Sequence, residues 1–125
     1  MTRIVSPTLL VLFLAAGCGA SSTDTVCTLE ARAGINVVVT DSVTGLPVTT
    51  GVTLFVQDGT FTDSAKVPPN ASPPVNSLGS AYEREGTYSV TVRADNYKAW
   101  NRSGVRVKSG ECHVEAVSLA AKLQR

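Results

Sequence analysis

The chain has 125 residues, 43% of them hydrophobic and 17% charged, which is typical of one folded domain and not of a disordered protein. Its 11 basic and 10 acidic residues give a formal net charge of +1, so we expect no nucleic-acid partner held by a large basic surface. One histidine, His113, excludes sites that need two, and we expect no metal and no cofactor. Because the number of cysteines is odd, at three, one cysteine has no partner in the chain if the other two form a disulfide.

Residues 1–17 have the pattern of an export signal. Arg3 gives a positive start, and the apolar segment from Thr8 to Ala16 is about half as long as the roughly 20 residues of a spanning helix. The following Ala15-Ala16-Gly17-Cys18 resembles the lipobox of bacterial lipoproteins, with alanine where that family prefers leucine. The resemblance implies cleavage after Gly17 and diacylglycerol on the thiol of Cys18. The alternative is an ordinary secreted protein.

The lipobox resemblance also implies a location. Two or three acyl chains hold a soluble domain stably at a bilayer, so the membrane is an expected partner and the bacterial cell envelope the expected compartment. Gly19, and not aspartate, follows the cysteine, which by the sorting rule of enteric bacteria favours the outer membrane. Cleavage removes Arg3 and leaves a chain without formal net charge. Small polar residues in the segment 18–26 predict a flexible tether.

Two cysteines remain for the domain expected over residues 27–125. Cys27 and Cys112 lie near its opposite ends, and export favours a disulfide between them. Closing a loop of this length stabilises a fold by roughly 4 to 5 kcal/mol in the chain-entropy model. The alternative is a pair of free buried thiols.

Apolar residues recur with a period of two, which predicts β-strands. The clearest run is Thr87–Ala94, where Tyr88 lies on the apolar face. In another run, Leu54 and its apolar neighbours share one face of the strand, and Phe55 lies on the opposite face together with Thr53 and Gln57. Strands with one apolar and one wet face favour antiparallel sheets that cover each other. We therefore predict an all-β antiparallel sandwich with strands at 35–40, 52–57, 87–94 and 105–108.

The end of the chain is less regular. Val114 is out of phase with the apolar residues of 117–123, which predicts a bulge near Glu115 and Ala116 or a strand buried on both faces. Composition alone would also allow a short helix over 116–122. Turns are marked by aspartate, glycine, asparagine or proline, and we expect them at Asp41–Pro47, Asp58–Gly59, Asp95–Asn96, Ser109–Gly110 and the proline-rich Pro68–Pro74.

Four segments together resemble the carboxypeptidase regulatory-like domain: 34–41, Thr44-Gly45-Leu46-Pro47-Val48, 86–94 and Asn96-Tyr97. The family pattern has glycine where Asn96 stands, a mild departure because asparagine also tolerates positive φ. The resemblance covers about residues 28–123. It implies a transthyretin-like or immunoglobulin-like sandwich of about seven strands, with Tyr97 in its core. It also implies an accessory or binding role, because the family's catalytic partner domain needs a zinc site that this chain lacks.

Few residues suggest chemistry. His113 and Glu115 are expected on one strand face, but two ligands do not make a stable zinc site, and we expect His113 to be an exposed strand residue. Together with the absence of a recognisable nucleophile motif, this predicts that the protein is not an enzyme.

Two aromatic residues near turns, Trp100 and Tyr82, are the candidate ligand-binding residues, because aromatic rings stack on sugars; the alternative is that Trp100 caps the core. A basic stretch could meet anionic lipid or glycan, or could simply keep the outer face soluble; it comprises Arg93, Lys98, Arg102, Arg106 and Lys108. We therefore expect a non-catalytic envelope lipoprotein whose single sandwich binds an envelope protein or a glycan. The alternatives are a carbohydrate-binding accessory protein and a structural component that pairs through a sheet edge.

Overall fold

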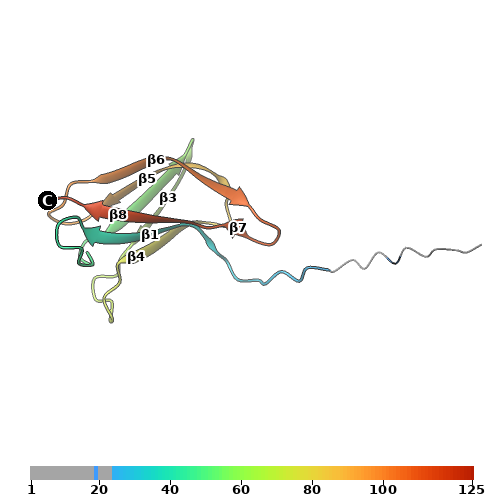
Figure 1. Cartoon of the computed structure of the whole chain (residues 1–125), viewed down its shortest axis with the longest axis horizontal. Helices are drawn as coiled ribbons and strands as arrows, with labels where there is room; N and C mark the ends of the chain where they lie inside the picture. The colour runs from blue at the N-terminus through green and yellow to red at the C-terminus, as the bar shows by residue number, and fades with distance from the viewer. Residues whose placement is uncertain (1–18, 20–23) are drawn as a thin grey trace, which may run out of the picture.

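The computed structural model describes residue 19 and residues 24–125, so Cys18 and the whole of the expected export signal, residues 1–17, lie outside the described residues. The fold is all-β, and the described part contains no helix (Figure 1). Eight strands follow one another along the chain: β1 (Ala33–Asp41), β2 (Thr53–Asp58), β3 (Phe61–Lys66), β4 (Ser77–Tyr82), β5 (Gly86–Arg93), β6 (Trp100–Ser109), β7 (Val114–Glu115) and β8 (Val117–Leu123).

The strands form two sheets, which confirms the predicted sandwich. One sheet has the order β4-β1-β8 and the other the order β3-β2-β5-β6-β7. One detail departs from the expected antiparallel arrangement, because β1 and β8 are parallel, paired from Ile35 with Val117 to Asp41 with Leu123. Alternation of apolar and polar residues tells which face of a strand is buried, but it does not tell the direction of the neighbouring strand.

The irregular end of the chain is a change of sheet. Val114 and Glu115 pair with β6, and after Ala116 the chain continues as β8 beside β1. The inward-facing phase therefore restarts at Val117, since each strand faces the core from a different sheet. The irregularity predicted near Glu115 and Ala116 is present, but it is a change of sheet between two strands and not a bulge or a strand buried on both faces. The alternative of a helix over 116–122 is wrong.

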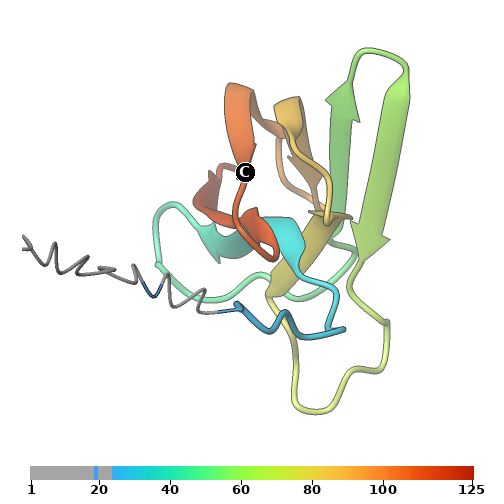
Figure 2. The ribbon, with the colours of Figure 1, turned by 90° about the vertical axis from the view of Figure 1, so that its right-hand side faces the viewer.

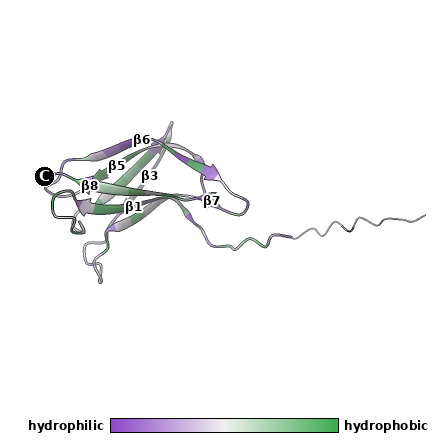
Figure 3. Ribbon diagram, viewed as in Figure 1, coloured by the Kyte–Doolittle hydropathy of each residue, from purple (hydrophilic) through white to green (hydrophobic). Residues whose placement is uncertain are grey.

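The core lies between the sheets and follows the predicted alternation. Val37, Leu54 and Val92 have no exposed surface, and Tyr88 is also buried. Hydrophobic residues colour much of β1, whereas much of β6 is hydrophilic (Figure 3). Burying a branched aliphatic side chain of this kind stabilises a fold by about 1.5–3 kcal/mol, so these strands hold the sandwich together.

The connections divide the sandwich into two poles. The segment 24–32 joins β1 at what we call the tether pole, beside β7 (Figure 1). The longer connections, 42–52, 67–76 and 94–99, lie at the opposite end, together with the C-terminus, and we call this the loop pole. Figure 2 looks at the tether pole, with the β2–β3 hairpin at one side of the sandwich.

Candidate functional site

A disulfide fixes the N-terminal segment at the tether pole. Cys27 and Cys112 are bonded, with their Cα atoms 5.2 Å apart, although the two residues are 85 positions apart in the sequence. Beside this bridge, the Thr25 hydroxyl donates a hydrogen bond of 2.6 Å to Glu111. The predicted bridge is therefore present, and it ties the segment that precedes β1 to the turn between β6 and β7.

His113 lies next to the bridge, and its predicted environment is wrong. It precedes β7 instead of sharing a strand face with Glu115, because a hydrogen bond from Gly110 N–H to the His113 carbonyl closes a turn here. Its side chain is only 12% exposed. Nδ1 lies 2.6 Å from Glu83 Oε1, and Nε2 lies 2.9 Å from the Thr28 hydroxyl oxygen.

Thr28, His113 and Glu83 thus stand in the order hydroxyl, imidazole, carboxylate, which also occurs in hydrolases. Here the carboxylate also accepts backbone N–H bonds from Arg32 at 2.7 Å and from Val114 at 3.3 Å. These bonds, that from Arg32 most of all, hold the pKa of Glu83 below its usual range. The group therefore joins three separate chain segments, and we interpret it as a clamp.

At the loop pole, the carboxylate of Asp41 is almost fully enclosed. Its Oδ1 accepts the backbone N–H groups of Val43 at 2.9 Å and Thr44 at 3.0 Å, which confirms the predicted aspartate turn. Its Oδ2 accepts the Tyr97 hydroxyl at 2.8 Å and Arg125 Nε at 3.3 Å. These bonds, led by that from Thr44, place the pKa of Asp41 far below its usual range.

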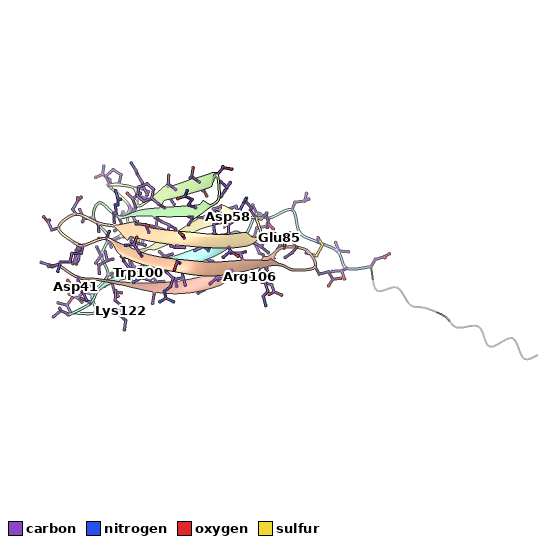
Figure 4. The ribbon with its side chains drawn as sticks, turned by 90° about the horizontal axis from the view of Figure 1, so that it is seen from above. Asp41, Asp58, Glu85, Trp100, Arg106 and Lys122 are labelled. Carbon is purple, nitrogen blue, oxygen red and sulfur yellow. A yellow bond between two sulfur atoms is a disulfide. The ribbon has the colours of Figure 1, made fainter. Side chains whose placement is uncertain are left out.

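A cleft of about 540 Å³ opens beside this carboxylate, lined by Asp41, Ser42, Val43, Thr44, Gln124 and Arg125. The carboxylate already has four donors, so it has little capacity left for a ligand. Asp41 therefore organises the loop, and Figure 4 shows it at this end of the molecule.

The outward side of the five-stranded sheet carries a different kind of surface, which we call the Phe55 face. Strand register places Phe55 of β2 between Ser64 of β3 and Thr91 of β5, and Thr91 opposite Asn101 of β6. A second row, Thr62, Gln57 and Ser89, lies alongside it. Phe55 is 40% exposed among these hydroxyl and amide side chains, an unusual position for a large apolar residue.

Two hollows flank the Phe55 ring. One, of about 190 Å³, is lined in part by Gln57, Thr62 and Ser89, and the other, of about 120 Å³, by Phe55, Thr91 and Arg93. The Arg93 guanidinium carbon lies 5.6 Å from the ring centroid. The Thr91 hydroxyl donates to Asn101 Oδ1 at 2.9 Å. The result is an aromatic ring set in a surface of hydrogen-bonding groups, with a cation at its edge.

The two predicted binding residues do not come together. Trp100, at the start of β6, is half-buried against the core, with the Arg102 guanidinium carbon 5.5 Å from its ring. It lines a hollow of about 190 Å³ with Lys98, Asn101 and Lys122, among others. Tyr82 is 55% exposed, but it ends β4 in the other sheet. Tyr97 packs against the core, as the resemblance implied.

Sequence reasoning missed Phe55, Thr28 and Glu83 as residues of interest. For Phe55 the signal was available, because the alternation in β2 already placed an aromatic residue on the wet face. Thr28 and Glu83 carry no such signal, since only folding brings them to His113.

The described residues contain neither a group of three or more potential metal ligands nor a helix long and apolar enough to span a bilayer. The chain was also compared with known protein families and with curated proteins. No family model matches the chain, and no curated protein matches it.

Proposed function

We propose that this protein is a non-catalytic lipoprotein of the bacterial cell envelope, anchored through Cys18, whose sandwich is a carbohydrate-binding module of the carboxypeptidase regulatory-like type. The lipobox resemblance supports the anchor, and the four matching segments support the family. The two-sheet fold and the buried Tyr88 of the Gly86–Arg93 strand are compatible with that family. Binding is assigned to the Phe55 face.

The observation that carries this assignment is the exposed ring of Phe55 among hydroxyl and amide side chains, with Arg93 at its edge. An aromatic face offers an apolar platform to the C–H groups of a sugar ring, and hydroxyl and amide side chains exchange hydrogen bonds with its hydroxyls. Gln57, Ser89 and Thr91 are placed for this beside the ring. Strand-borne side chains also hold a fixed geometry better than side chains on loops.

The position of the tether is compatible with this role. The disulfide holds residues 24–32 at one pole, whereas the Phe55 face extends along the side of the sandwich. An anchor at the tether pole therefore leaves the face free to meet a polymer. Figure 4 looks onto this side of the molecule, with Arg106 toward the tether pole and Trp100 toward the loop pole.

The alternative of pairing through a sheet edge has less support. Asp63 of β3 accepts the Ser80 hydroxyl at 2.6 Å and the Ala81 backbone N–H at 3.2 Å. A side chain of one sheet thereby occupies a backbone donor on β4, an edge strand of the other. This protects the edge against addition of a foreign strand.

Binding to an array of bacterial and plant glycans tests the proposal, with the full-length protein held in lipid nanodiscs. We expect bound glycans, and we expect Phe55→Ala to lose the signal. The control is Val43→Ala, which truncates a more exposed apolar side chain at the loop pole and should leave binding unchanged. A blank array, or equal losses in the two variants, would overturn the assignment.

A further inference from the structure

Charge on the Phe55 face is segregated by sign. The outward positions of β2, β3, β5 and β6 include four charged side chains, and all are basic: Lys66, Arg93, Arg106 and Lys108. The two acids of these strands point the other way. Asp58 is paired with Arg84 at 2.9 Å, and Asp63 is held by Ser80.

This segregation is not a consequence of overall charge, since the whole chain carries only +1. Acidic residues are found instead at the poles, where Asp41 and Glu83 are held by backbone amides and Glu111 by Thr25. Two acids lie close to the face: Asp63, which is among the residues that line the larger hollow beside Phe55, and Glu115 of the two-residue β7, at the sheet edge opposite Lys108. The face is therefore a local basic surface on a nearly neutral protein.

The basic character continues around β6. Thr91 lines the hollows beside Phe55, and its partner Asn101 lines the hollow of Trp100. Lys98 and Lys122 line that hollow, and no carboxylate does. The Trp100 ring itself projects from the opposite face of the sheet, because Trp100 pairs with the buried Val92, whereas Phe55 pairs with the outward Thr91. The Trp100 hollow, with Arg102, Lys98 and Lys122, is therefore a second basic surface at the β6 edge and not part of the Phe55 face.

We propose that the Phe55 face binds an acidic polysaccharide, with a sugar ring on Phe55 and carboxylates on Arg93 and on the other outward basic residues, Lys66, Arg106 and Lys108. The inference rests on the proposed carbohydrate-binding function and names the class of glycan. Guanidinium and ammonium groups at the edges of aromatic platforms complement an anion carried on a sugar ring.

An anionic membrane is a poorer fit. Interfacial binding to lipid requires apolar side chains that enter the bilayer, and Phe55 is the only large apolar residue on the outward side of β2, β3, β5 and β6. The rows of hydroxyl and amide groups, in contrast, match the many hydroxyls of a polysaccharide. Charge complementarity and hydrogen-bonding capacity together favour the acidic glycan.

The test uses polygalacturonate and alginate as acidic probes and fully methyl-esterified polygalacturonate as the neutral partner with the same backbone. Binding of the full-length protein in nanodiscs is measured by biolayer interferometry at 50 and 300 mM salt. We expect binding to the acidic polymers, weaker at high salt, and little binding to the ester. Arg93→Gln should weaken binding by about fivefold or more, and Phe55→Ala likewise.

Arg32→Gln is the matched control, because it removes the same charge from the exposed segment at the tether pole. Equal losses in Arg93→Gln and Arg32→Gln would overturn the site. Equal binding to acid and ester would overturn the acidic class while leaving carbohydrate binding intact. The protein could instead bind anionic vesicles or dextran sulfate as tightly as polygalacturonate, with no effect of Phe55→Ala. That result would mean that the surface attracts polyanions in general, and it would overturn the assignment to an acidic glycan. No binding to any probe, with a blank glycan array, would overturn both proposals.

Discussion

The Tyr97 hydroxyl donates a hydrogen bond of 2.8 Å to the carboxylate of Asp41, a residue 56 positions earlier in the chain. Asp41 ends β1 in one sheet, and Tyr97 belongs to the connection between β5 and β6 in the other. Arg125 donates to both oxygens, at 3.3 Å to Asp41 and 3.2 Å to Tyr97. A single carboxylate therefore closes the loop pole across both sheets.

We expect Asp41 to make the stability of the fold sensitive to acid. Folding lowers its pKa from the ordinary 3.8, so the ionised carboxylate stabilises the fold at pH values above 3.8. That contribution declines as the pH falls below 3.8 toward the lower pKa of the folded state. Asp41→Asn should be less stable than the wild type at pH 7 and should lose less stability between pH 5 and 2. Urea unfolding across this range measures both effects.

The exposed Glu85→Gln is the control for removal of one charge, and it should follow the wild-type curve. Glu83 and Asp63 also have lowered pKa values, so Asp41→Asn should reduce the acid sensitivity without abolishing it. An Asp41→Asn curve parallel to that of the wild type would show that this carboxylate gains nothing from its four donors.

The disulfide should contribute several kcal/mol. Cys27 and Cys112 enclose most of the fold, and the chain-entropy model gives roughly 4 to 5 kcal/mol for such a loop. We expect Cys27→Ser with Cys112→Ser to lower the free energy of unfolding by about 2–5 kcal/mol. Denaturant curves of the variant and of the wild type with and without reductant check this. An intact mass that does not rise by two hydrogens on reduction would contradict the bridge.

Lipid attachment is predicted for the remaining cysteine. Cys18→Ser should abolish incorporation of labelled palmitate and release the protein from the membrane fraction, since one thiol carries the diacylglycerol in the proposed scheme. Cys112→Ser is the matched control, and labelling should survive it. Labelled palmitate that persists in the Cys18→Ser variant would remove the lipoprotein proposal while leaving the sandwich untouched.

If His113, Glu83 and Thr28 form a structural clamp, substitutions at His113 and Thr28 should lower stability, and no catalytic activity should depend on these residues. His113→Leu removes the contacts to Glu83 and Thr28 and should lower the free energy of unfolding by about 1 kcal/mol or more, and Thr28→Val by less. If the group were instead a catalytic relay, the wild type would show saturable hydrolysis of p-nitrophenyl esters that both variants lose. We expect no saturable hydrolysis in any of the three.

The local sequence pattern predicted those features of the fold that depend only on which face of a single strand is buried. The buried phase of Val37, Leu54 and Val92 and the outward Phe55 follow from alternation, and the break near Ala116 follows from the shift in phase. The parallel pairing of β1 with β8 does not, because it depends on the sheet that the chain joins after the break.

The same limit applied to the candidate site. Glu83 adopts a φ of 49°, which turns its carboxylate toward segments far away in sequence, and no local pattern marks that conformation. Trp100 is half-buried because it faces Val92 across β5 and β6, at the end of a pairing whose register shifts between Tyr88 and Val90. Such long-range relationships decide which of the aromatic residues are available to a ligand.

Leu54 and Phe55 are adjacent in β2, and substitutions at these two positions should have separate effects, one on stability and the other on binding. Leu54 is fully buried, so Leu54→Ala should cost about 2–5 kcal/mol through lost burial and the cavity left behind. Phe55→Ala removes a larger side chain but from the solvent-exposed face, and it should change the free energy of unfolding by less than about 1 kcal/mol while weakening glycan binding by about fivefold or more. Thermal unfolding and glycan binding, measured on both variants, check this. A Phe55→Ala variant as unstable as Leu54→Ala would mean that the ring holds the sheet together, and the exposed aromatic would no longer be free to serve a ligand.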